Sequence, residues 1–160
     1  MSSFALQRGY NDGANCCPGH QAWRRLGDLS SEIFATGLHR VTEQTHSVPA
    51  FLAQARKKVF HSAYNIDKME ATFFGRPPRI PKHYCSTTLP FDVDDRTFFD
   101  GSSTADTALD TMAWNQDSHF YPATWIRVRS MVSQIKEKVL ETVLDPEGPT
   151  SPSDAELVLS

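Results

Sequence analysis

Residues 49–78 read PAFLAQARKKVFHSAYNIDKMEATFFGRPP, and this stretch decides the fold that the sequence predicts. Pro49 suits the first turn of a helix, because the N–H that proline lacks would find no partner there. Gly75 can adopt positive φ at a helix end, and the prolines just after it exclude a further helical turn. We therefore expect one long helix from about Pro49 to Phe74. We favour a rigid corner after it over an effector-driven hinge, because prolines stiffen a chain.

Apolar residues recur along this helix at helical spacing and predict the face that packs into the core. The predicted stripe consists of Leu52, Ala55, Val59, Ala63 and Ile66, thickened by Phe51, Phe60, Tyr64 and Phe73. Arg56, Lys57 and Lys58 would begin the polar face. Successive helix residues point about 100° apart, so these three cations cannot form one contact with a nucleic-acid groove. A solvated helix face is the simpler interpretation.

Two other segments carry helical spacing. The first begins near Gln21 and ends near Gly37, with Leu26, Leu29 and Ile33 on its apolar stripe. The second begins at Pro122 and ends near Leu144, and its opposite face is charged. Its apolar stripe comprises Trp125, Val128, Val132, Ile135, Val139 and Val143.

The segments between the helices read as irregular chain. Residues 79–90 are expected to be ordered loop or extended chain, and residues 92–101 an acidic connection anchored by Phe98 and Phe99. A short helix is expected after Ser103, with spacing set by Ala105, Leu109, Met112 and Ala113. Neither an internal repeat nor a coiled-coil heptad is visible. The pattern alone predicts an all-α fold, an irregular helical bundle with long ordered loops.

Composition indicates one soluble globular domain. The chain has 160 residues, of which 39% are apolar and 22% are charged, unlike a disordered segment. It has no secretory signal and no apolar run of about 20 residues, so we expect an intracellular protein without a membrane span. Cys16, Cys17 and Cys85 form an odd set with one adjacent pair. This disfavours a disulfide framework and fits reduced thiols.

Charge is distributed unevenly along the chain, although the net charge is only −3. Seven basic residues and two acidic ones lie between Arg56 and Lys82, a local balance of +5. Between Asp92 and Asp117, seven aspartates oppose Arg96, a local balance of −6. We interpret the two stretches as neighbours within one fold and not as a nucleic-acid footprint.

Candidate catalytic and metal-binding groups are scattered. The possible acid–base groups include His39, His46, His61 and His83. No spacing links a nucleophile, a base and an orienting carboxylate, which disfavours an enzyme. His83-Tyr84-Cys85 could place two metal ligands on one face, with Cys16-Cys17 adding thiolates, but structural zinc usually needs four ligands in tighter pairs. We expect no catalytic residue, no metal site and no cofactor in this chain.

Two blocks of the sequence resemble the regulatory middle-homology domain of fungal binuclear-zinc-cluster transcription factors. The first block contains Trp23, Gly27, Gly37, Leu38, His39 and Arg40. The second and more specific block contains Arg56, Phe60, Tyr64, Asp67, Lys68, Gly75, Arg76, Pro77, Leu89 and Pro90. Two positions depart from the family pattern. His61 stands where tryptophan is frequent, so looser or more polar packing is expected beside Phe60. Thr36 stands where an apolar residue is usual.

The resemblance implies a division of the chain and a regulatory function. Residues 1–19 would be a loop or the remnant of a preceding element, residues 20–144 a fragment of the helical regulatory domain, and residues 145–160 a linker and the start of a truncated helix. The family's DNA-binding module is a six-cysteine cluster with two zinc ions, which three cysteines cannot form. DNA binding and zinc binding would therefore be supplied by a cluster absent from this chain.

In an intact factor, such a domain would modulate DNA-templated transcription in the nucleus, in response to protein partners or a small-molecule effector. Two alternatives stay open. One is a small helical enzyme or ligand-binding protein that uses the histidine-rich surface, and the other is a truncated, non-functional copy.

Overall fold

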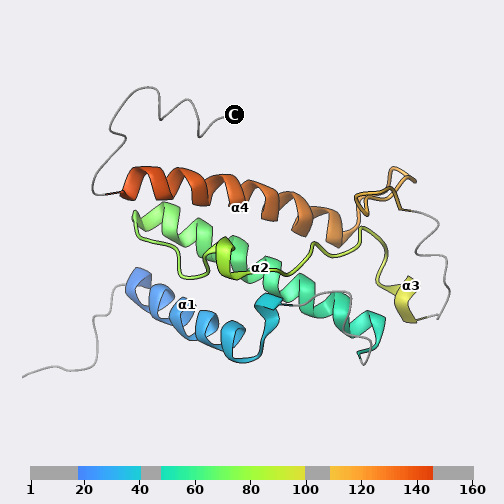
Figure 1. Ribbon diagram of the computed structural model, residues 1–160, viewed down its shortest axis with the longest axis horizontal. Coiled ribbons are helices and arrows are strands. Elements are labelled where there is room, and N and C mark those ends of the chain that lie inside the picture. Colours follow the sequence, from blue (N-terminus) through green and yellow to red (C-terminus); the bar gives the residue numbers. More distant parts are fainter. Residues whose placement is uncertain (1–17, 41–47, 100–108, 146–160) are drawn as a thin grey trace, which may run out of the picture.

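The computed structural model describes residues 18–40, 48–99 and 109–145, and its regular elements in these ranges are all helical (Figure 1). The α-helices are α1 (Pro18–Ala35), α2 (Ala50–Phe74), α3 (Arg96–Phe99) and α4 (Pro122–Leu144). Two short 3₁₀ helices, η1 (Leu38–Arg40) and η2 (Lys82–Tyr84), lie within the connections. The described ranges hold no sheet, only one isolated bridge between Leu109 and Asn115. The all-α prediction is confirmed.

The long helix α2 is the centre of the fold. It packs against α1 on one side and more extensively against α4 on the other, and α4 runs in the same direction as α2 while α1 runs opposite to it (Figure 1). None of the helices in the described ranges is long and apolar enough to cross a membrane. The arrangement places α2 where it can join residues from both outer helices.

The predicted ends of α2 are confirmed to within one residue. Pro49 is the residue before the first turn, not within it. Gly75 closes the helix in the left-handed conformation, with φ 59° and ψ 43°, and its N–H donates to the carbonyl of Ala71. The N–H of Arg76 donates to the same carbonyl at 3.0 Å. The chain therefore leaves the helix through a glycine-dependent corner.

The predicted core face of α2 is only partly correct. Its buried apolar residues Phe60, Ala63 and Tyr64 join Ile33 of α1 and Ile80 in one core cluster. The other members of the predicted stripe are exposed: Phe51, Leu52, Ala55, Val59, Ile66 and Phe73. The helix also buries a polar strip against α4 and against the loop of residues 79–91. That strip includes Gln54, Lys57, His61, Asp67 and Lys68.

The orientation of α4 is the reverse of the usual amphipathic arrangement. The apolar residues of the predicted stripe are all exposed: Trp125, Val128, Val132, Ile135, Val139 and Val143. The buried face is mostly polar and includes Thr124, Arg127, Ser130, Ser133 and Glu137. Serines are small enough to let two helices approach closely, and the longer polar groups find partners on α2 and the loops. The stripe is therefore a second outward face, not part of the core.

A turn replaces part of the short helix expected after Ser103. Over residues 109–113, the Asp110 carboxylate accepts hydrogen bonds from the N–H groups of Met112 and Trp114, each at 2.8 Å. Ala113 has φ 61°, which no α-helix contains. An aspartate that captures nearby backbone donors competes with helix formation. The other residues of that predicted helix, 103–108, lie outside the described residues, as do 1–17, 41–47 and 146–160.

Phe98 and Phe99 anchor the acidic connection, as predicted. They lie in α3, where Phe99 stacks on Phe51 with ring centroids 5.4 Å apart and Phe98 stacks on Phe91 at 6.5 Å. Lys58 of α2 forms an ion pair with Asp95, just before α3. This pair confirms that the basic and acidic stretches meet within the fold. Lys57 behaves differently, because it is buried with its ammonium over the ring of Phe91.

Candidate functional site

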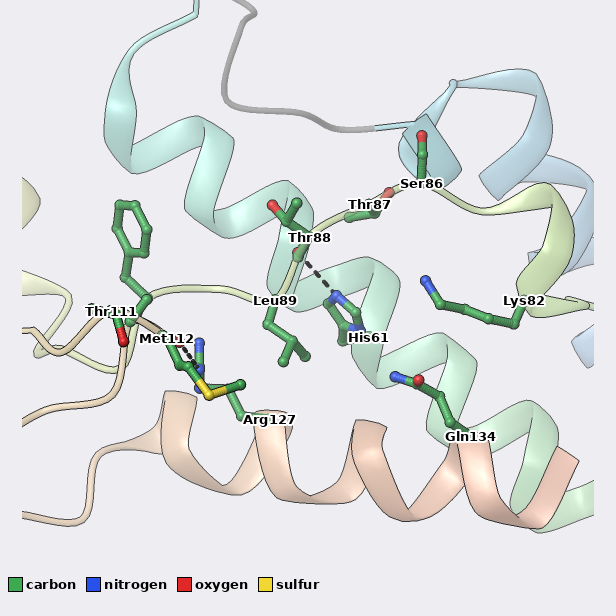
Figure 2. Close-up of a pocket in the computed structure, with 12 residues that line it drawn as sticks. His61, Lys82, Ser86, Thr87, Thr88, Leu89, Thr111, Met112, Arg127 and Gln134 are labelled. Carbon is green, nitrogen blue, oxygen red and sulfur yellow. Dashed lines mark hydrogen bonds between the residues drawn. The ribbon is translucent and has the colours of Figure 1, made fainter. Parts of the chain in front are cut away.

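A cavity of about 550 Å³ lies between α2, the segment from η2 to Phe91, the turn at residues 111–113, and α4. Figure 2 shows the side chains of Lys82 and Gln134 pointing toward the ring of His61, with Arg127 and Met112 on the far side. Ser86, Thr87 and Thr88 form part of one wall. Leu89, Phe91, Met112 and Ala113 add apolar surface to the lining. Its cationic side chains are Lys82 and Arg127, and none of its lining residues is acidic.

His61 sits at the centre of this cavity in a neutral form. Its Nε2 lies 3.0 Å from the carbonyl oxygen of Thr88, which can only accept, so Nε2 carries the proton. Nδ1 then accepts from the Ser130 hydroxyl at 2.7 Å. Burial, together with the charges of Lys82, Lys57 and Arg127, lowers the pKa of His61 from 6.5 to about 4. The His61 ring packs edge to face on Phe60, with ring centroids 5.1 Å apart, and its hydrogen bonds to Ser130 and Thr88 make the packing there more polar.

Arg127 brings a buried positive charge to the cavity. The residue is 1% exposed, its guanidinium donates to the carbonyls of Pro90 and Met112, and it lies 4.2 Å from the centre of the Trp114 ring. Its Nε has no hydrogen-bond partner within the described part of the chain. Burial lowers the pKa of this group, while Asp92 and Asp110 oppose that shift. Its partners within hydrogen-bond reach are thus neutral carbonyls.

Asp92 is occupied by other contacts. Its carboxylate accepts from the hydroxyl of Thr124 and from the side-chain amide of Asn115, and it is 1% exposed. The same Thr124 hydroxyl accepts from the N–H of Tyr121 in a capping box at the start of α4. Asp92 therefore fixes the loop onto α4 and does not enter the wall of the cavity.

A buried ion network lies next to the cavity and joins α2 to α4. Lys68 donates to Asp67 at 2.8 Å and lies 3.2 Å from Glu137, and all three side chains are almost fully buried. The hydroxyl of Tyr64 also donates to Glu137, and burial together with this bond raises the pKa of the tyrosine. The other oxygen of Glu137 accepts from the N–H of Lys82 at 2.7 Å. Glu137 thus connects the cavity wall to the core.

The Gly-Arg-Pro corner is held from both sides. Asp67 accepts from the N–H groups of Arg79 and Ile80, at 2.9 and 3.0 Å, so the loop after the corner docks on α2. The guanidinium of Arg79 lies 4.4 Å from the centre of the Trp23 ring on α1, and that of Arg76 lies 5.2 Å from it. At Gly27, an added Cβ would lie 3.0 Å from Nη1 of Arg79. Glycine there gives the guanidinium room to reach the tryptophan.

The remaining residues of the family motif lie around η1, at the cavity or on the exposed surface. Gly37, with φ 72°, turns the chain into η1, where the backbone carbonyl of His39 accepts from the N–H groups of Ser86 and Thr87. Leu38 packs against the core cluster, while Arg40 is exposed. Leu89 lines the cavity and Pro90 supplies a carbonyl to Arg127, whereas Arg56 and Pro77 are exposed.

Sequence reasoning missed the residues of α4 that build this region. Arg127, Ser130, Ser133 and Glu137 recur every three or four residues, which is the same helical spacing that identified the apolar stripe. The sequence pattern marks this side only as the charged face opposite the apolar stripe. The available signal of a buried polar face was that every residue at this spacing is either a small serine or a side chain that can form several hydrogen bonds.

The described ranges 18–40, 48–99 and 109–145 contain no group of three or more His, Cys, Asp or Glu side chains that could hold a metal ion. His83 and Tyr84 are exposed, and Cys85 is buried, with the pKa of its thiol raised by burial. The adjacent cysteines Cys16 and Cys17 lie outside the described residues. The residues that the structure describes therefore do not fit a zinc cluster.

The fold and the site define a helical domain with a buried ion network and a cavity that two cations line. The family model described as the fungal specific transcription factor domain matches residues 15–160, and the chain belongs to this family. This is a family of transcription factor domains and not a class of enzymes, and the resemblance drawn from the sequence is confirmed.

Among curated proteins, the chain is similar to Pyrimidine pathway regulatory protein 1 of Saccharomyces cerevisiae (strain ATCC 204508 / S288c). The two are 29% identical over 73 residues, which is 46% of this chain and 8% of that protein. The match thus spans less than a tenth of the relative's length. No solved structure matches the chain.

Proposed function

We propose that this chain is a regulatory domain of a fungal transcription factor, and that a small anionic molecule binds in the cavity around His61. In this proposal the domain acts in the nucleus, modulates transcription, and depends on a zinc cluster elsewhere for DNA binding. Family membership supports the regulatory assignment. The single observation that supports the effector class is the cavity itself, which presents Lys82 and Arg127 without an acidic lining residue.

An anion would give Lys82 and Arg127 a directly bonded ionic partner, in addition to the more distant charges of Asp92 and Asp110 that act on Arg127. Arg127 is bonded to neutral carbonyls, and the Lys82 ammonium donates to the carbonyl of Cys85 at 3.2 Å. A carboxylate between these groups would gain charge-assisted hydrogen bonds, which are stronger than neutral ones. Thr88 and Gln134 would supply further polar contacts at the rim. A small dicarboxylate fits this chemistry better than an apolar or cationic ligand.

Binding is tested with succinate as the probe and succinamide, its neutral isostere, as the control. We expect succinate to raise the melting temperature of the chain by mass action and to raise the pKa of His61, followed by its imidazole NMR signals. Lys82→Met should weaken this response. The matched variant Lys138→Met, an exposed cation outside the cavity lining, should not. Equal responses to succinate and succinamide would refute the anion site.

The regulatory role is tested separately in cells. The chain is placed between a heterologous DNA-binding domain and an activation segment, and reporter transcription is measured. We expect the chain to change reporter output relative to a neutral linker of the same length, and Lys82→Met to alter that change. If the chain and the linker give the same output, the chain is not a regulatory domain, whatever it binds.

A further inference from the structure

The exposed apolar stripe of α4 lies on the side of the helix that faces away from α2. Ser130, Ser133 and Glu137 contact α2, through His61, Asn65 and Lys68 respectively. A helix turns by about 100° per residue, so the stripe lies on roughly the opposite side. We call the residues Trp125, Val128, Val132, Ile135, Val139 and Val143 the outer stripe. In Figure 1, α4 forms an outer edge of the bundle, with α2 on its inner side.

The outer stripe is long, regular and open. Trp125 is 58% exposed, Ile135 is 63% exposed and Val143 is 70% exposed. The first five members are spaced by three and four residues in alternation, which is the seam of a helix that pairs with another helix. The stripe spans 18 residue steps, or roughly 27 Å at about 1.5 Å per residue. A contiguous apolar surface of this kind marks an interaction site.

The rim of the outer stripe is positively charged. Arg129, Lys136 and Lys138 are the charged residues that flank it. The acidic residues of α4 lie elsewhere, because Glu137 is buried toward α2 and Glu141, four positions later, is on the same side as Glu137. A partner that covers the stripe therefore meets cations along its edges and gains from carrying acids there.

We infer that the outer stripe binds an amphipathic helix of a partner protein, about five turns long, with apolar residues at three–four spacing and acidic residues on both flanks. A second copy of this chain fits less well. Pairing α4 with α4 brings Arg129, Lys136 and Lys138 together with their own copies, and like charges at these positions disfavour pairing. The exposed stripe of α2 is flanked by Arg56, so pairing α2 with α4 adds a further like charge, while Lys58 beside it is already paired with Asp95.

The surface is separate from the cavity, so it is tested independently of the effector. The probe is a synthetic peptide of about 19 residues with leucines at three–four spacing and glutamates on both flanks. The control peptide has the same leucines and lysines in place of the glutamates. Each peptide carries like charges on both flanks, and these oppose the pairing of that peptide with itself. Binding of each labelled peptide to the full chain is measured by fluorescence anisotropy.

We expect the glutamate peptide to bind roughly tenfold more tightly than the lysine peptide, since three exposed ion pairs together contribute about that factor. Added salt should reduce the difference in affinity between the two peptides, because it screens the ion pairs. Ile135→Glu should abolish binding, whereas Phe73→Glu, which adds the same charge to the exposed stripe of α2, should not. Lys136→Glu combined with Lys138→Glu should reverse the preference between the peptides.

Three results would overturn the inference. Equal affinity for the two peptides would remove the requirement for an acidic partner. If neither peptide binds a chain that unfolds cooperatively, the outer stripe is not a binding surface for such a helix. A dimer in sedimentation equilibrium that Ile135→Glu dissociates would assign the stripe to a second copy of the chain.

Discussion

Lys68 and Glu137 lie 69 positions apart in the sequence, yet Nζ of Lys68 is 3.2 Å from Oε2 of Glu137 in the interior of the domain. Asp67 binds the same ammonium at 2.8 Å, and Tyr64 donates to the same carboxylate. One cation thus serves two carboxylates in a site that excludes water. Removing it would leave both buried carboxylates without their cation and with neutral donors alone, which is far more costly than losing an exposed pair.

Lys68→Met is expected to destabilise the chain by about 3–5 kcal/mol. Adding Glu137→Gln to that variant should cost less than the same change costs in the unmodified chain, because the carboxylate would otherwise remain buried without its cation. The free energies of unfolding of the four chains, measured by urea denaturation, give the coupling. Costs that simply add would show that the two residues do not interact.

Stability should fall as pH is lowered, through His61. In the folded chain its pKa is lowered to about 4, while in the unfolded chain the value is near 6.5. Between these values the unfolded state binds the extra proton, so stability is lost as pH falls from 6.5 to 4, by about 3 kcal/mol at most. Denaturation at a series of pH values measures this slope. His61→Gln should flatten it, and an unchanged slope in that variant would assign the effect to other groups.

Gly75→Val should destabilise the chain by about 1–2 kcal/mol, because valine is strained at the φ of 59° that the corner requires. Free space surrounds the site, so the cost would come from the backbone and not from a clash. Gly75→Asn is the matched control, since asparagine tolerates this conformation. Thermal melts of the three chains compare them. A melting temperature that valine leaves unchanged would remove the structural role of the corner.

The helix limits could be predicted from the sequence because their signals are local. Pro122 and Gly75 act on the backbone of their own turns. As a result, α4 begins at Pro122 and α2 ends just before Gly75, as predicted. The prediction of a helix over residues 109–113 was wrong, also for a local reason. The apolar spacing there suggested a helix, but the carboxylate of Asp110 captures the N–H groups that a helix would use.

The buried faces could not be predicted, because burial depends on which elements meet. The local sequence alone does not place Ser130 and Glu137 in the interior; they are buried because His61 and Lys68 of α2 lie opposite them. Sequence spacing identified a stripe on α4 correctly but carried no information on the side that α2 covers. The cavity was missed for the same reason, since its lining comes from four separate segments of the chain.

The most direct test of this account compares two neighbouring substitutions on α4. Val132→Glu places a charge on the outer stripe, and Ser133→Glu places the same charge in the buried interface beside Asn65. Thermal melts of both variants are measured against the unmodified chain. We predict that Val132→Glu leaves the melting temperature nearly unchanged, whereas Ser133→Glu lowers it strongly or prevents folding. The opposite order, with Val132→Glu the more damaging, would contradict the polar packing of α4 on α2.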